Sequence, residues 1–176
     1  ATPGGYIFIT TAALHEMKSE AELAAVLAHE IAHVVERHIV KALKIKAVDD
    51  SMTDVLGKIV GGNNMTANTL FGQALEQAFE ILFSKGLKVE DEYLADKLGL
   101  LLVSLAGYET KGVFEYLERI NPIINKSNQQ LSNTHPEITL RIKNLKKSYA
   151  ESGLLEISGI RNTQRLQKYK NMREYK

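Results

Sequence analysis

Three of the five histidines in this chain lie in one eleven-residue stretch, AHEIAHVVERH, at residues 28–38. His29 and His33 are four residues apart, and side chains at that spacing lie on one face of a helix, one turn apart. The two imidazoles can therefore bind one metal ion. Glu30 projects about 100° away around the helix axis. It can reach a water molecule on the ion without being a ligand, which is the HExxH arrangement of a catalytic zinc site.

The same pattern could also belong to an ordinary helix that carries polar side chains on its surface. The neighbouring sequence argues against this, because ELAAVLAHEIAHVV around the motif is strongly apolar. Burying two histidines and a glutamate there without partners would be costly, and a metal ion supplies partners for all three. His38 lies nine residues after His29, about 180° around a continuous helix, so we expect a surface or packing residue that cannot share the metal.

A zinc site needs a third ligand, and the chain has no cysteine to supply one. The metzincin extension is absent, because its glycine and histidine positions hold Glu36 and Ile39. The segment EDEYLADKLG at 90–99 offers Glu92 and Asp96, four residues apart. Glu92 could bind the metal while Asp96 accepts a hydrogen bond from a ligand histidine. The alternative is an acidic helix start, since carboxylates favour the first turn of any helix.

The elements that must position these residues are mainly helices. Ser19 and Glu22 have the spacing of a capping box, which predicts a long helix from there to about residue 46. The segment YIFIT at 6–10 follows a PGG turn and predicts a short strand. Polar and glycine-rich residues predict a loop over 61–69. Further helices are expected over 70–83, over 89–105, over 110–120 with Asn-Pro at 121–122 ending it, and from Pro136 to about 150.

Composition indicates one domain with an ordinary core. The chain has 176 residues, of which 44% are hydrophobic and 24% charged, and its net charge of +1 gives no reason to expect nucleic-acid binding. No apolar run reaches the length of a membrane span. The expected fold is predominantly α with a small β element (α+β), with the domain over 1–156 and a basic tail over 157–176. The tail could contact an anionic membrane or a partner, but a solvated helix is the favoured interpretation.

Four separated motifs resemble peptidase family M48, the gluzincin family that includes HtpX and the CAAX prenyl endopeptidase. The motifs are HEIAHVVERH, EYLAD about sixty residues later, AGYE and HPEITLRI, and they occur in the family's order. The resemblance covers most of residues 3–145. It implies a zincin-like domain with one Zn²⁺ per chain, in which His29, His33 and Glu92 are the ligands and Glu30 is the catalytic base.

The resemblance also implies roles for three further residues. Asp96 matches the aspartate of the family's E-x-x-x-D motif, while His135 and Arg141 match its HP-x-x-x-x-R segment near the metal. His135 would steady the tetrahedral intermediate or act as a regulatory metal ligand, and Arg141 would help to offset the developing negative charge. From the residues alone, His135 would be a loop histidine and Arg141 a surface residue of a helix.

The implied function is a zinc-dependent endopeptidase that hydrolyses unfolded or misfolded proteins with a zinc-activated water. The chain resembles bacterial members without membrane spans, which implies protein quality control in the cell envelope, in the periplasm, with peripheral membrane association as an option. The family's strand before PGG, which would align substrate by backbone pairing, has no counterpart here, so we expect the domain to lack it. The alternative is a non-catalytic metal-binding or chaperone-like module that holds unfolded clients in the same groove.

Overall fold

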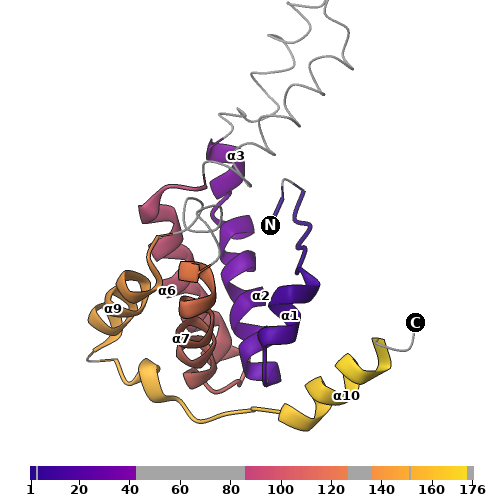
Figure 1. Ribbon diagram of the computed structural model, residues 1–176. Coiled ribbons are helices and arrows are strands. Elements are labelled where there is room, and N and C mark those ends of the chain that lie inside the picture. The colour runs from indigo at the N-terminus through magenta and orange to yellow at the C-terminus, as the bar shows by residue number, and fades with distance from the viewer. Residues whose placement is uncertain (3, 43–85, 127–135, 151, 174–176) are drawn as a thin grey trace, which may run out of the picture.

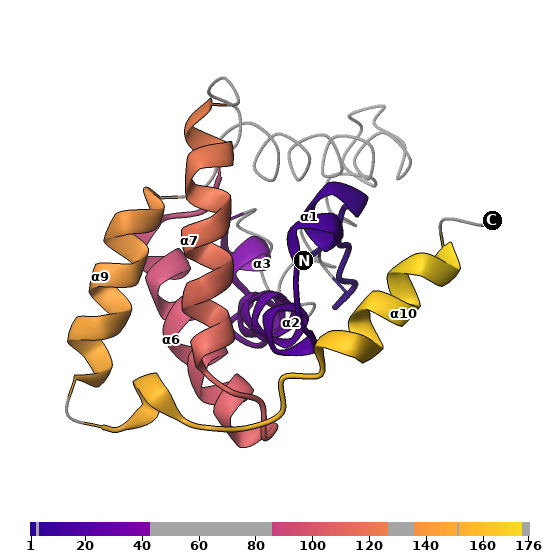
Figure 2. The same ribbon diagram turned by 60° about the horizontal axis from the view of Figure 1, so that its bottom comes forward.

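The computed structural model describes residues 1–2, 4–42, 86–126, 136–150 and 152–173. In these ranges the chain forms helices arranged around a central one, α2 (Glu20–Val35) (Figure 1). On one side of α2 lie α6 (Val89–Leu105), α7 (Lys111–Lys126) and α9 (Ile138–Tyr149). On the other side lie α1 (Thr11–Glu16) and α10 (Thr163–Arg173) (Figure 2). A short 3₁₀ turn, η2 (Leu154–Glu156), precedes the segment that leads to α10.

α2 begins with the capping box that the sequence predicts. Ser19 Oγ accepts a hydrogen bond of 3.3 Å from the backbone N–H of Glu22, and Glu22 Oε2 accepts one of 2.8 Å from the N–H of Lys18. Arg119 on α7 donates a 3.0 Å hydrogen bond to the other oxygen of the Glu22 carboxylate, which is fully buried. The predicted start of the helix is therefore confirmed, and a partly buried ion pair between Arg119 and Glu22 holds it against α7.

The predicted end of this helix is wrong, because α2 stops at Val35 and not near residue 46. Arg37 adopts a left-handed φ of 54°, which interrupts the helical ladder. A separate short helix, α3 (His38–Ala42), starts at the next residue, and residues 43–46 lie outside the described ranges. Left-handed turns usually carry glycine, so an arginine in this position offers the sequence no signal of the break.

The later predicted helices agree with the structure except at a proline, whereas α1 was not predicted from the sequence. α6 spans Val89–Leu105 as predicted, and α9 falls within the helix predicted from Pro136. α7 continues to Lys126, so the prediction that Asn-Pro ends it is wrong. A proline inside a helix loses one backbone hydrogen bond, but Ile120 and Ile124 on either side of it pack on the core and offset that loss. The predicted loop and helix between 61 and 83 lie outside the described residues.

The small β element remains a prediction. Residues 6–10 are extended, but they form no strand in the described part of the chain, and Tyr6 and Phe8 are strongly exposed. In the same ranges, β pairing is limited to an isolated parallel bridge between Tyr108 and Ile160. The described residues are thus mostly helical, which fits a zincin-like domain.

The main core lies between α2, α6, α7 and α9. α6 approaches α2 closely at Gly99, where an added Cβ atom would lie 3.2 Å from the backbone nitrogen of His29. The buried apolar residues of this core are Ala25, Ala28, Leu100, Val103, Val113, Phe114, Leu117, Ile138 and Leu145. A second cluster joins Met17 and Tyr116 to Leu166 of α10, so part of the segment after residue 156 packs against the helices of the domain.

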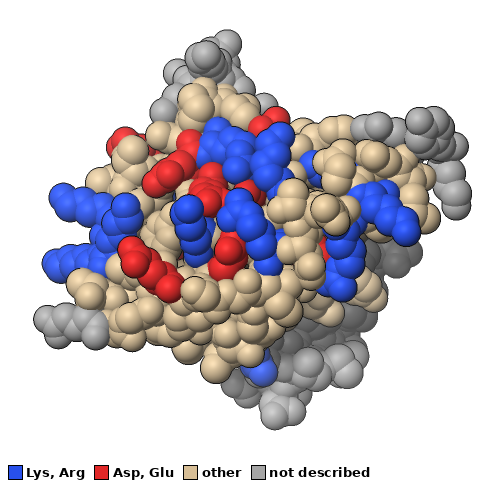
Figure 3. Space-filling model, turned by 90° about the horizontal axis from the view of Figure 1, so that it is seen from below, with Lys and Arg blue, Asp and Glu red and all other residues tan. Residues whose placement is uncertain are grey.

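The basic tail does not form a uniform positive surface. The face shown in Figure 3 carries Lys and Arg side chains interleaved with Asp and Glu. Arg161 donates a 2.7 Å hydrogen bond to Glu115, Arg165 pairs with Glu20, and Lys170 donates to the backbone oxygen of Met17. Two arginines of the tail are therefore paired with carboxylates of the domain, while Lys170 is held by uncharged backbone oxygens. Among the described helices, none is both long and apolar enough to cross a membrane.

Candidate metal centre

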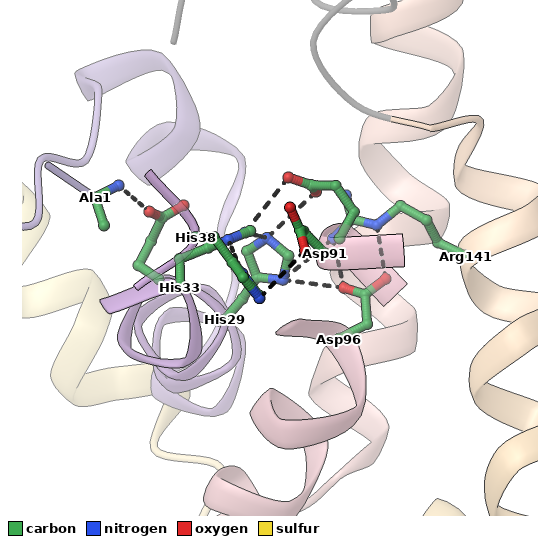
Figure 4. Close-up of polar contacts among 9 residues, drawn as sticks. Ala1, His29, His33, His38, Asp91, Asp96 and Arg141 are labelled. Carbon is green, nitrogen blue, oxygen red and sulfur yellow. Dashed lines mark hydrogen bonds and ion pairs between the residues drawn. The ribbon is translucent and has the colours of Figure 1, made fainter. Parts of the chain in front are cut away.

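α2 and α6 lie side by side and carry the residues that we expect to bind metal. The Nε2 atoms of His29 and His33 are 3.0 Å apart (Figure 4). The carboxylate of Glu92, in the first turn of α6, lies 3.6 Å from His29 Nε2 and 3.4 Å from His33 Nε2. One donor atom from each residue lies within 4.8 Å of the others, and the described residues contain no other such group. The fold therefore brings the predicted ligands together.

The spacing and chemistry of these donors fit a divalent metal such as zinc. Bonds of about 2.0–2.2 Å from zinc to nitrogen or oxygen place tetrahedral ligand atoms roughly 3.3 Å apart, close to the spacings here. His33 is 4% exposed and Glu92 is 1% exposed, so bulk water supplies few partners for their polar atoms. A cation between the three side chains would satisfy donors that otherwise face one another in a buried site.

The surroundings give the two histidines different proton affinities. Burial, together with the neighbouring His29, lowers the pKa of His33 to about 3, so its ring is neutral as a metal ligand must be. Burial also acts to lower the pKa of His29, but hydrogen bonds to Asp96 and Glu92 outweigh it and raise that pKa to about 9. A metal binding to His29 would therefore displace a proton.

Asp96 and Arg141 lie beside Nδ1 of His29, the outer ring nitrogen, which faces away from the donor group. Asp96 Oδ1 lies 3.0 Å from His29 Nδ1, the contact that the sequence predicts for a ligand histidine. Arg141 on α9 donates to both oxygens of Asp96, with distances of 2.8 Å and 2.6 Å. Burial acts to raise the pKa of Asp96, but Arg141 outweighs it and lowers that pKa to about 2. The surface position inferred for Arg141 from the residues alone is wrong, because the side chain is buried.

The other two predicted catalytic residues are placed differently. Glu30 follows His29 on α2, its carboxylate is 21% exposed, and it contacts the amino group of Ala1 (Figure 4). It is not part of the three-residue donor group, as expected from its orientation around the helix. His135 lies outside the described residues, so the role predicted for it stays a prediction.

One contact of the site was not predicted from the sequence. His38 Nδ1 lies 2.9 Å from His33 Nδ1, and His38 is 1% exposed. Of the two alternatives expected for His38, the surface position assumed a continuous helix and is wrong, because the turn at Arg37 returns the side chain to α2, whereas the packing alternative agrees with its burial. Asp91 lies 3.6 Å from the other nitrogen of His38, although the sequence indicated only an acidic helix start there. The sequence did contain one signal for this contact, namely the third histidine of the 28–38 stretch.

A cleft of about 590 Å³ opens beside His29 and Glu30. Apolar side chains line most of it, and Asp96 and Arg141 contribute polar groups. A concave, mostly apolar cavity with a few polar groups is typical of a binding site. The apolar residues that matter here are Val113, Tyr116, Leu117, Ile120, Ile124 and Ile138.

The helical fold and the HExxH pattern together are typical of the zincin class of metallopeptidases. A family model described as Peptidase family M48 matches residues 1–149, so the chain belongs to that family. It is 29% identical over 142 residues to the mitochondrial metalloendopeptidase OMA1 of Arabidopsis thaliana, covering 80% of this chain and 27% of that protein.

Two other relatives give a similar result. The identity is 28% over 151 residues with the mitochondrial metalloendopeptidase OMA1 of Saccharomyces cerevisiae, covering 82% of this chain and 41% of that protein. It is 29% over 145 residues with the beta-barrel assembly-enhancing protease of Yersinia pestis, covering 76% and 28% respectively. The chain thus spans less than half the length of each of these relatives.

Proposed function

We propose that this protein is a zinc-dependent endopeptidase that acts on unfolded or misfolded proteins. The observation that carries the proposal is the convergence of His29, His33 and Glu92 from two helices, with Glu30 and an apolar cleft beside them. A zinc ion held by these ligands would supply Lewis-acid chemistry, polarising a water molecule and the scissile carbonyl.

In the proposed mechanism, Glu30 is the general base. Its carboxylate takes a proton from the attacking water and later donates it to the leaving amine. Asp96 accepts the hydrogen bond from His29 Nδ1 and so holds this ligand in one tautomer and orientation. His135 is proposed to stabilise the tetrahedral intermediate or to act as a regulatory ligand.

For Arg141 we propose a positioning role through Asp96, in addition to the predicted role of offsetting the charge that develops on the substrate in the cleft that it lines. Two of its guanidinium nitrogens are engaged with Asp96, and one of these lies 3.4 Å from His29 Nδ1. The guanidinium thus faces the outer nitrogen of the ligand, on the side away from Nε2. Its charge keeps Asp96 ionised, which in turn keeps His29 oriented.

The cleft suggests the class of substrate. Its apolar lining would accept a bulky apolar side chain beside the scissile bond, and unfolded chains expose side chains of this kind that folded proteins bury. We propose protein quality control in the bacterial cell envelope, in the periplasm, on the basis of the sequence resemblance. The name of the Yersinia pestis relative, which refers to beta-barrel assembly, supports this proposal.

The test compares the parent protein with Glu30→Gln, using casein as an unfolded substrate. The variant should retain one zinc per chain, because Glu30 is not in the donor group, and should lose cleavage by at least about 100-fold. Parent activity should disappear with a chelator and return with zinc. Glu36→Gln, just beyond the end of α2, is the matched control and should cleave normally. A Glu30→Gln variant that cuts casein at the parent rate contradicts the mechanism.

The apolar character of the cleft also suits the alternative, a metal-binding or chaperone-like module that holds clients without cleaving them. The two functions differ in one measurement. A folded, zinc-loaded protein that suppresses aggregation of casein but yields no fragments would favour the module over the peptidase.

A further inference from the structure

The predicted metal ligand His33 is contacted on its outer nitrogen by a second histidine. The two Nδ1 atoms are 2.9 Å apart, and the ring centroids are 5.0 Å apart with the planes at 74°. His33 is 4% exposed and His38 is 1% exposed. Two imidazole nitrogens at this distance share a single proton, because a hydrogen bond needs one donor and one acceptor.

The position of His33 decides which ring donates. Its Nε2 atom faces His29 and Glu92 in the donor group, so this nitrogen must present its lone pair to a metal. The ring proton then sits on His33 Nδ1, and His38 Nδ1 must accept it. The proton of His38 is consequently on Nε2, which faces a carboxylate oxygen of Asp91 at 3.6 Å (Figure 4). The contact between the two histidines is a hydrogen bond, and the longer contact to Asp91 places a negative charge beside the His38 proton.

We propose that His38 is a positioning residue of the metal site, which fixes the tautomer and ring orientation of His33 and is itself oriented by Asp91. The inference rests on the proposed role of His33 as a metal ligand. With this role for His38, the two ligand histidines have different partners on their outer nitrogens. The outer nitrogen of His29 faces an Asp96–Arg141 ion pair, whereas the outer nitrogen of His33 faces a second imidazole.

The local fold supports a specific role for this contact. The left-handed residue Arg37 ends α2 and lets α3 return His38 to the helix that it has just left. Ile39, the next residue of α3, is apolar and buried at 5% exposure. Burying an imidazole costs more than burying an apolar side chain unless its nitrogens find partners. His33 provides a partner for Nδ1 of His38, whereas Nε2 makes no direct hydrogen bond among the described residues and has the Asp91 carboxylate nearby at 3.6 Å.

The experiment measures zinc binding and the histidine tautomer, not peptide cleavage, so its outcome is distinct from that of the proposed function. His38→Leu removes both nitrogens, and His38→Asn keeps a side-chain oxygen that can accept from His33 Nδ1. Ile39→Ala is the matched control, since it loosens α3 without removing a hydrogen bond. Zinc affinity is measured by competition with a chelating dye, site geometry by the visible spectrum of the cobalt-substituted protein, and the tautomer by nitrogen NMR of labelled histidines.

We expect His38→Leu to weaken zinc binding by about 10- to 100-fold and to change the cobalt spectrum, the usual effect of losing such a partner. His38→Asn should recover most of this loss, and Ile39→Ala should stay within about threefold of the parent in zinc affinity. The zinc-loaded parent should show the ring proton of His33 on Nδ1 and that of His38 on Nε2, which leaves His38 Nδ1 free to accept from His33. This last measurement decides the matter if His38→Leu does not fold.

Three results would overturn the proposal. The first is a folded His38→Leu variant that binds zinc as tightly as the parent. The second is an Ile39→Ala variant that weakens zinc binding as much as His38→Leu, which would reduce His38 to a packing residue. The third is a zinc-loaded parent in which His33 Nδ1 carries no proton.

Discussion

Arg141 and Asp96 are joined by two parallel hydrogen bonds, although 45 residues separate them in the chain. Arg141 Nε lies 2.8 Å from Oδ2 and Nη2 lies 2.6 Å from Oδ1. Both side chains are buried, so the pair is little screened by solvent. The contact ties α9 to α6 and sets the carboxylate against His29, which makes it both a structural joint and a support for the proposed metal site.

Replacing Arg141 with methionine should destabilise the metal-free protein by about 3–5 kcal/mol, because the change leaves an ionised Asp96 buried without its partner. Adding Asp96→Asn should restore part of this loss, since the unpaired charge is then removed. Urea unfolding of the two single variants and the double variant gives the coupling energy. The exposed Lys143 on the same helix provides the control, as Lys143→Met should change stability by less than about 0.5 kcal/mol. A loss of under 1 kcal/mol for Arg141→Met would contradict the expectation.

The Asp96 carboxyl should also make the free energy of unfolding depend on pH in the acid range. Its pKa is about 2 in the folded protein against a usual 3.8. A lowered folded-state pKa stabilises the protein above the unfolded value, and that stability is lost as the pH falls toward 2. The contribution is about 2 kcal/mol at neutral pH. Urea unfolding of the metal-free parent should therefore weaken more between pH 5 and pH 2 than that of Asp96→Asn. Parallel pH profiles for the two proteins would show that Asp96 is not responsible.

Gly99 should be intolerant of even a methyl group. An alanine Cβ there would lie 3.2 Å from the backbone nitrogen of His29 and 3.3 Å from its Cα, so α6 would have to move away from α2. We expect Gly99→Ala to cost about 1–3 kcal/mol of stability and to weaken zinc binding, because the donors on the two helices separate. Thermal unfolding and dye competition measure these effects. Ser104→Ala, further along α6, is the comparison and should leave zinc affinity unchanged.

The cleft beside Glu30 should influence which peptides are cleaved. Ile120 lines it, and Ile120→Phe would reduce the room for a bulky apolar side chain of the substrate. The ratio of kcat/KM for a peptide with leucine beside the scissile bond to that for one with alanine should fall about tenfold, a typical effect of a small change in pocket size. Leu140→Phe, an exposed change on α9, should leave the ratio unaltered. If the ratio is unchanged in Ile120→Phe, the cleft does not determine which side chain is accepted beside the scissile bond.

Much of the site could be predicted because its parts depend on short-range geometry. The pairs His29–His33 and Glu92–Asp96 share a helical face through their spacing alone, and the capping box at Ser19 is likewise a contact between residues three apart. The bounds predicted for α6 also agree with the structure. These relations are properties of one helix and do not depend on what packs against it.

Other features were decided by packing between distant segments. The left-handed turn at Arg37, which buries His38, has no local signal, and α7 passes through Pro122 because the residues around it are held by the core. The ion pair between Arg141 and Asp96, and the distance from Glu92 to the two histidines, exist only because α6 and α9 meet α2 in one arrangement. Helical periodicity is fixed by backbone geometry within a few residues, whereas these contacts depend on the burial of apolar surface between helices from separate parts of the chain.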